Sequence, residues 1–166
     1  PDANPDPKLA AHDIRETFGR MAMNDYETAA LVAGGHTFGK SHGAASESYK
    51  GPDPEASRLQ DQSTGWNSGY KSGKGVDAIS SGIEGAWTQN PIKWDMGYLD
   101  CLYGHDWELT KSPAGAHQWT PKKNGQKIKM VPDAHKKGVL HPPMMQTTDI
   151  SMKVDPSYGP ITKHFH

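Results

Sequence analysis

Residues 29–43 read AALVAGGHTFGKSHG and hold the strongest local pattern in the chain. Small and apolar residues lead to a glycine pair, Gly34-Gly35, and then to His36, near the end of a helix predicted over residues 27–40. Because the glycines carry no side chain, a flat ligand can approach the helix closely while His36 presents an imidazole to it. That arrangement suits an axial metal ligand. The plain alternative has equal weight here: the glycines only end the helix, and His36 is a partly exposed side chain.

The segments around this stretch predict a mainly α-helical fold with long loops and a small β-hairpin. Apolar residues at three- and four-residue spacing indicate an amphipathic helix from Lys8 to Met23, antiparallel to the helix that follows it. A third helix is expected over 94–107, ended by Gly104, and shorter ones begin near Thr147 and after residues 155–156. The hairpin is expected around residues 124–125, joining 118–119 to 128–131, with loop over 132–143. Residues 43–75 are expected to be one long irregular excursion.

Composition narrows the classes of function. The chain has 166 residues with 34% hydrophobic content, which predicts one domain or a piece of a larger one. Lys and Arg number 18 against 19 Asp and Glu, so no basic field is available to bind nucleic acid or an anionic membrane. One cysteine, Cys101, excludes an internal disulfide and favours a reducing, cytoplasmic location. No apolar run is long enough for a membrane span, whereas 9 His, 5 Trp and 7 Met favour metal or redox chemistry.

The stretch 29–43 closely resembles the proximal haem-ligand segment of class I haem peroxidases, and of catalase-peroxidases above all. The likeness continues in that family's order through PDPKLAAHDIRETFGRMAMND at 5–25, and through residues 82–87, 103–118 and 147–155. It covers essentially the whole chain. The resemblance implies that residues 1–166 are the proximal half of a helical haem-peroxidase domain, in the later part of the N-terminal haem domain.

The resemblance assigns the proximal site. It implies that His36 is the iron ligand of haem b. It also implies that Trp87 and Asp149 are the partners that complete a proximal triad. A carboxylate that accepts the second imidazole N–H raises the basicity of the ligand and fixes its tautomer. From the residues alone, the favoured interpretation of Trp87 is a core aromatic side chain. Asp149 is then a helix N-cap, a role that can coexist with the other.

Five further residues match positions with roles in the family. Met21 matches the methionine of a covalent Met–Tyr–Trp link associated with catalase turnover, although the other two members have no match here. Its spacing to Phe18 alternatively predicts an ordinary core thioether. Lys40, Ser41, His42 and Ser81 resemble residues that line the haem propionates or the access channel. Otherwise Lys40 and Ser41 are solvated side chains and Ser81 is an N-cap for a helix from Ile83.

The implied function is that of a bifunctional enzyme which breaks down hydrogen peroxide and oxidises small electron donors with haem b. The implied partners are the remainder of the parent chain and a second copy in a homodimer. The family's distal Arg, Trp and His have no match, and the second, haem-free domain is absent from these residues. The isolated chain is therefore expected to be a poor catalyst. The alternative is a catalytically inactive, stable fragment that acts as a binding or interaction protein through exposed apolar surface. The remaining histidines are expected on the surface because they lack acidic companions; they include His12, His105, His117, His135 and His141.

Overall fold

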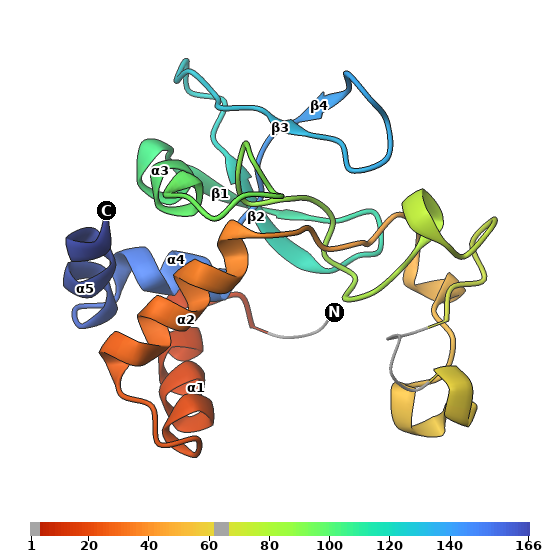
Figure 1. Cartoon of the computed structure of the whole chain (residues 1–166), viewed down its shortest axis with the longest axis horizontal. Coiled ribbons are helices and arrows are strands. Elements are labelled where there is room, and N and C mark those ends of the chain that lie inside the picture. The colour runs from red at the N-terminus through yellow and green to blue at the C-terminus, as the bar shows by residue number, and fades with distance from the viewer. Residues whose placement is uncertain (1–3, 62–66) are drawn as a thin grey trace.

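The computed structural model describes residues 4–61 and 67–166, and its described part is mainly helical with two small antiparallel sheets (Figure 1). The mainly α-helical prediction with a small hairpin is confirmed. The helices are α1 (Pro7–Gly19), α2 (Asp25–Thr37), α3 (Gly97–Gly104), α4 (Thr147–Val154) and α5 (Tyr158–Phe165). The strands are β1 (Trp107–Lys111), β2 (His117–Pro121), β3 (Val131–Pro132) and β4 (Leu140–His141). Short 3-10 turns occupy Glu47–Tyr49, Pro54–Ala56, Leu59–Asp61 and Gly75–Asp77.

Capping side chains set the bounds of the first two helices. The α1 helix begins where the Asp6 carboxylate accepts the Lys8 N–H, and it ends at Gly19 instead of Met23. Ala22 then takes a left-handed conformation with φ of 59°, which turns the chain. A capping box between Asn24 and Glu27 starts α2 two residues earlier than predicted. The α2 helix also ends earlier, at Thr37, because Phe38 is extended.

The helices from the first part of the chain pack against the helices from its last part. The α1 helix packs mainly against α4, and α2 packs mainly against α5, so the close α1–α2 pair that was predicted does not form (Figure 1). The apolar residues before the glycine pair of α2 are not all buried. Leu31 is 51% exposed, whereas the buried side chains of α2 are Thr28, Ala29 and Thr37. The fully buried centre of the core consists of Tyr98, Leu102, Met145, Met152 and Tyr158.

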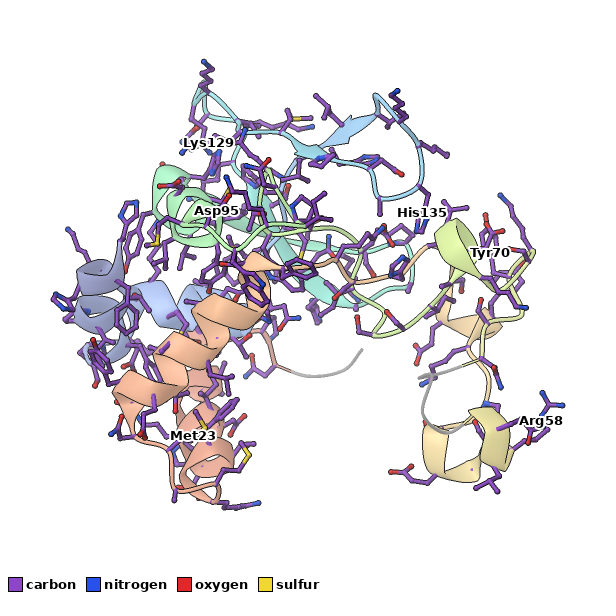
Figure 2. All side chains as sticks on the ribbon, viewed as in Figure 1. Met23, Arg58, Tyr70, Asp95, Lys129 and His135 are labelled. Carbon is purple, nitrogen blue, oxygen red and sulfur yellow. The ribbon has the colours of Figure 1, made fainter. Side chains whose placement is uncertain are left out.

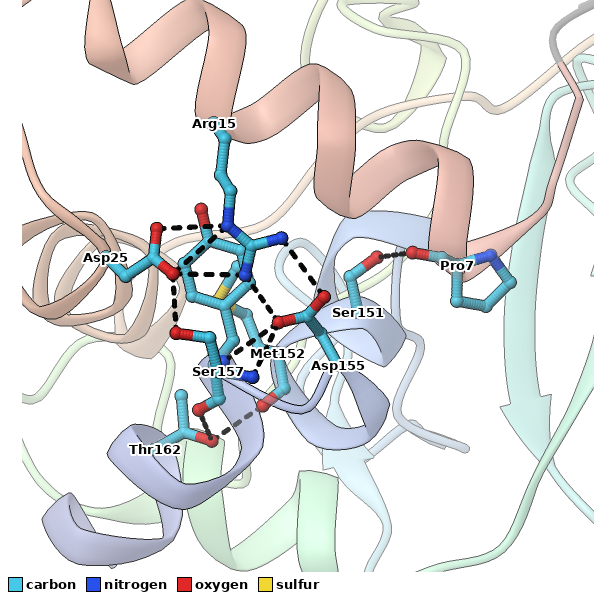
Figure 3. Close-up of polar contacts among 9 residues, drawn as sticks. Pro7, Arg15, Asp25, Ser151, Met152, Asp155, Ser157 and Thr162 are labelled. Atoms are coloured by element: carbon cyan, nitrogen blue, oxygen red, sulfur yellow. Dashed lines mark hydrogen bonds and ion pairs between the residues drawn. The ribbon is translucent and has the colours of Figure 1, made fainter.

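One arginine ties these helices together. Arg15 on α1 donates to the carboxylates of Asp25 on α2 and Asp155 before α5, at 3.1 Å and 2.5 Å (Figure 3). Asp25 also accepts the Ser157 hydroxyl at 2.6 Å, and the Arg15 guanidinium lies 4.4 Å from the centre of the Tyr158 ring. The cluster therefore links three helices, and the guanidinium of Arg15 is fully engaged in it.

The hairpin differs from its prediction. The β1 strand pairs with β2 in antiparallel register, with Leu109 opposite Trp119, so the 94–107 helix prediction was too long at both ends. The helix α3 stops at Gly104, the residue expected to end it, although the predicted range continued to 107. The predicted pairing of 118–119 with 128–131 is wrong, and residues 132–143, expected as loop, contain the two-residue pairing of β3 with β4. A bridge between Trp119 and Met145 then leads the chain into α4.

The described residues between α2 and α3, 38–61 and 67–96, contain no α-helix and no named strand. The predicted excursion over 43–75 is irregular apart from 3-10 turns, and its residues 62–66 lie outside the described part. Two bridges, Ser41 with Gly85 and Gly43 with Ile79, set residues 79–85 beside the chain that leaves α2. Gly43 permits this approach, because a Cβ there would collide with the Gly82 carbonyl. No helix starts near Ile83, so the prediction of Ser81 as an N-cap is wrong.

Across residues 4–61 and 67–166, no helix is both long enough and apolar enough to cross a membrane.

Candidate functional site

The site is centred on His36, which lies in the last turn of α2. The Thr37 hydroxyl donates to the Ala33 carbonyl and supports this turn. The His36 ring stacks on the Trp87 indole, with 4.2 Å between ring centres and 14° between planes. Its Nδ1 lies 2.6 Å from Oδ1 of Asp149, so the predicted hydrogen bond is present. The His36 side chain is 23% exposed and the Asp149 side chain is fully buried, so the contact joins a surface-facing ring to the core.

The Asp149 carboxylate accepts four hydrogen bonds from four different parts of the chain. Its Oδ2 accepts the Trp87 Nε1–H at 2.9 Å and the Gln146 backbone N–H at 2.7 Å. Its Oδ1 accepts His36 Nδ1–H and also the Tyr98 hydroxyl, which lies at 2.8 Å. An ionised carboxylate offers about four acceptor positions. All of them are used, and this satisfies the buried charge.

The position of Asp149 comes from the start of α4. Asp149 and Gln146 form a reciprocal capping box at that end of the helix. The N-cap of α4 is Gln146, so the prediction of Asp149 as the N-cap is wrong. Asp149 lies at the third helical position and accepts the Gln146 N–H, and this contact coexists with the contact to His36. Trp87 is both a buried side chain and an Asp149 partner, so its two alternatives coexist as well.

The charge of Asp149 governs the protonation of His36. Burial lowers the pKa of His36, but the negative charge of Asp149 and the hydrogen bond to it outweigh burial, and the net pKa is raised. The Asp149 contact keeps a proton on Nδ1, so the neutral ring carries its lone pair on Nε2. Burial raises the pKa of Tyr98 well above its ordinary value, so its hydroxyl stays protonated and acts as a donor.

The donor set would fit a haem iron, which His36 would hold. Within the described residues, no group of three or more His, Cys, Asp and Glu side chains is placed to hold a bare metal ion. His36 offers a single nitrogen, and its opposite ring N–H donates to a carboxylate, which is the usual arrangement of an iron-binding histidine. A single protein ligand suits an iron that a porphyrin already surrounds.

The segment that follows α2 contains Lys40, Ser41 and His42. Lys40 is 15% exposed and pairs with Glu84, Nζ to Oε1, at 2.6 Å, so it is not a freely solvated side chain. Ser41 belongs to the bridge with Gly85. Nε2 of His42 lies 3.0 Å from Nε2 of His135, and burial together with the charge of Lys40 lowers the pKa of His42.

Ser81 and Met21 lie in different surroundings. Ser81 is exposed at a hollow of about 500 Å³, whose wall also includes Ile14 and Phe18 of α1 and Thr148 beside Asp149. Met21 is 56% exposed in the turn after α1, so the prediction of a core thioether is wrong. Figure 2 labels Met23, two residues after Met21, at the end of the molecule that lies away from Asp95. Asp95 lies close to the site, because its carbonyl oxygen accepts the hydroxyl of Thr37, the residue after His36. The structure does not bring Met21 to the other site residues.

Two donors of the site were missed in the sequence. Tyr98 lies on the helix predicted over 94–107 without an assigned role, and Gln146 acts through its backbone N–H. A tyrosine on the buried face of a helix needs a hydrogen-bond partner for its hydroxyl. This requirement is the sequence feature that could have indicated a role for Tyr98. His105 is not on the surface as predicted: it is buried and accepts the Lys129 N–H. His141 is exposed as predicted, but it has an acidic partner, because its Nε2 lies 2.8 Å from the Asp133 carboxylate.

The fold and the site define a helical domain with a histidine that is hydrogen-bonded to a buried carboxylate and stacked on a tryptophan. The peroxidase family model matches residues 2–166, and the chain belongs to the peroxidase family. It is 62% identical over 167 residues to a catalase-peroxidase of Koribacter versatilis, and 59% identical over 167 residues to one of Gloeobacter violaceus. A catalase-peroxidase of Mycobacteroides abscessus is 61% identical over 165 residues. These alignments cover 99–100% of this chain but 22–23% of each relative, so the chain spans less than a quarter of their length.

Proposed function

We propose that this chain supplies the proximal side of a haem b site in a bifunctional catalase-peroxidase, with His36 as the iron ligand through Nε2. The observation that carries the proposal is the hydrogen bond from His36 Nδ1 to a buried carboxylate whose acceptor positions are all filled. Such a carboxylate is fixed in place, so it fixes the tautomer and the plane of the ring. The likeness to catalase-peroxidases over the whole chain supports the assignment.

Haem b, when bound, supplies the iron that takes oxidising equivalents from hydrogen peroxide and passes them to a second peroxide or to a small electron donor. In this chain Asp149 keeps the proton on Nδ1 of His36 and makes Nε2 more basic. The stack on Trp87 holds the plane of the ring and covers one of its faces. Trp87 also donates to Asp149, so these two residues act as one support for His36.

The remaining assigned residues serve the edges of the cofactor and the substrate path. Lys40, Ser41, His42 and Ser81 would contact the haem carboxylates or line the access channel, because three of them follow His36 within six residues and Ser81 borders the hollow near Thr148. The exposure of Met21 leaves its sulfur accessible to the tyrosine of a Met–Tyr–Trp link, which has no match in this sequence.

The whole protein is proposed to act on hydrogen peroxide and small electron donors, as a homodimer in the cytoplasm. Residues 1–166 would be the proximal part of its haem domain, and the distal groups and the second domain would come from other parts of that protein. The coverage of 22–23% of the relatives' length leaves room for both.

A haemin titration of the purified chain tests the proposal. We expect a saturable Soret band with the position of a histidine-bound haem, and its loss in His36→Ala. His12→Ala is the matched control, because His12 is an exposed histidine of α1 that has no part in the site. A His36→Ala chain that binds haemin as the unsubstituted chain does would refute His36 as the ligand.

A second candidate for the isolated chain is binding without catalysis. A hollow of about 430 Å³ runs along α2 and is lined by Ala30, Ala33 and Gly34, with the exposed Trp94 at its border. Exposed apolar surface of this kind often marks an interaction site. In this case the chain would show no saturable Soret change, and it would self-associate in sedimentation runs in a way that Trp94→Ser abolishes.

A further inference from the structure

Two donors share one oxygen of Asp149. The Tyr98 hydroxyl lies 2.8 Å from Oδ1, and Nδ1 of His36 lies 2.6 Å from the same atom. Trp87 and Gln146 use the other oxygen. The hold of Asp149 on His36 therefore depends on how much of the negative charge at Oδ1 is already engaged by the tyrosine.

The fold keeps Tyr98 in this position. It is the second residue of α3, whose first turn is held by Asp95 accepting the Gly97 N–H at 2.8 Å. The Tyr98 side chain is fully buried, and its ring meets the His36 ring edge-on, with 5.9 Å between centres and 75° between planes. A buried hydroxyl cannot turn to water, so Asp149 is the partner that satisfies it.

We propose that Tyr98 is a positioning residue that acts through Asp149 and limits how much basicity this carboxylate gives to His36. The inference rests on the proposed role of His36 as the haem ligand. A hydrogen bond to an ionised oxygen draws charge toward the donor proton, so Oδ1 becomes a weaker acceptor for the second donor. Without the hydroxyl, the Nδ1 proton of His36 would be shared more strongly with Asp149, and the ring would become more like an imidazolate. An imidazolate-like ligand favours ferric over ferrous iron, and the reduction potential then falls.

The substitution Tyr98→Phe removes the hydroxyl and keeps the ring. The matched control is Tyr103→Phe on the same helix, because the Tyr103 hydroxyl contacts Gly159 and Thr162 and does not contact Asp149. The first measurement uses the cofactor-free chain and follows the NMR signal of the His36 Nδ1 proton. We expect a downfield shift in Tyr98→Phe, as for a stronger hydrogen bond, and no shift in Tyr103→Phe.

The second measurement is the ferric/ferrous potential of the haemin-loaded chains. We expect a lower potential in Tyr98→Phe than in the unsubstituted chain, an unchanged one in Tyr103→Phe, and no effect of Tyr98→Phe when Asp149→Asn is already present. A folded Tyr98→Phe chain whose His36 proton does not move, or whose potential rises, overturns the inference. Failure of His36 to bind haemin would defeat the proposed function instead, and the NMR measurement separates the two outcomes because it needs no haem.

Discussion

At the scale of single residues, the site depends on one carboxylate that is both buried and charged. Asp149 is fully buried, and burial of a charge is costly unless it is paired and hydrogen-bonded. Its four donors are His36, Trp87, Tyr98 and the Gln146 backbone. The first two were predicted from the sequence because the residues match a family pattern. Tyr98 was not, because periodicity marks a tyrosine as buried without telling which acceptor its hydroxyl meets.

We expect Asp149→Asn to lower the free energy of unfolding by about 1–3 kcal/mol, since a buried donor that loses its acceptor costs this much. The asparagine NH₂ group cannot accept, so it would face two of the four donors that now bind the carboxylate. Urea unfolding of the cofactor-free chain measures the effect. Asp13→Asn, at an exposed position of α1, is the control and should change little. Equal stabilities of the two variants would show that the four contacts are weak.

At the scale of elements, the sequence predicted which segments form helices better than where they end. Apolar spacing located α1 and α2, but the ends depend on Asn24, Glu27 and the left-handed Ala22, which act locally. The hairpin was misplaced because Asn124-Gly125 is a strong turn pair that lies after β2 and not between paired strands. The sequence of β1, WELTK, alternates apolar and polar residues, but its first residue, Trp107, was assigned to the helix predicted over 94–107.

The contacts of Arg15 with Asp25 and Asp155 link α1 to α2 and to the start of α5, and they should make the free energy of unfolding depend on pH. The hydrogen bond from Arg15 lowers the pKa of Asp155 from 3.8 to about 2. A carboxylate with a lowered pKa in the folded state stabilises the fold above its unfolded pKa, and the stabilisation is lost as the pH falls through its folded pKa. The free energy of unfolding contributed by Asp155 should therefore decline from about pH 4 to pH 2.

Asp155→Asn isolates this contribution. Asparagine can still accept the Ser157 and Tyr158 N–H groups that Asp155 Oδ1 accepts at 2.9 and 3.0 Å, so the start of α5 is kept while the charge is lost. Urea unfolding should show the variant less stable than the unsubstituted chain at pH 6, and the gap should close as the pH approaches 2. A difference in free energy of unfolding that stays constant between pH 6 and pH 2 would contradict an ionic contribution from the Arg15–Asp155 pair.

At the scale of the whole molecule, the site exists only when distant parts of the chain meet. His36 and Asp149 are 113 positions apart, and Trp87 comes from the irregular connection between α2 and α3. Spacing along a sequence carries no information about such a contact. The family resemblance supplied it, and the same resemblance could not tell that the Met21 side chain is exposed or that Lys40 is paired with Glu84.

The arrangement predicts weak catalysis by the isolated 166-residue chain. It has the proposed proximal ligand and its support, but the family's distal Arg, Trp and His have no match in the sequence. Of its three arginines, Arg15 is bound to Asp25 and Asp155 on the helical side of the fold (Figure 3). Acid–base groups placed at the reacting oxygen atoms are commonly worth a factor of about 10²–10⁴ in rate. We therefore expect the haemin-loaded chain to release oxygen from hydrogen peroxide at about the rate of free haemin. Oxygen evolution measured with the unsubstituted chain, His36→Ala and free haemin checks this. Fast release that disappears in His36→Ala would mean that the chain assembles distal groups of its own, for instance by pairing two copies, and the prediction would be wrong.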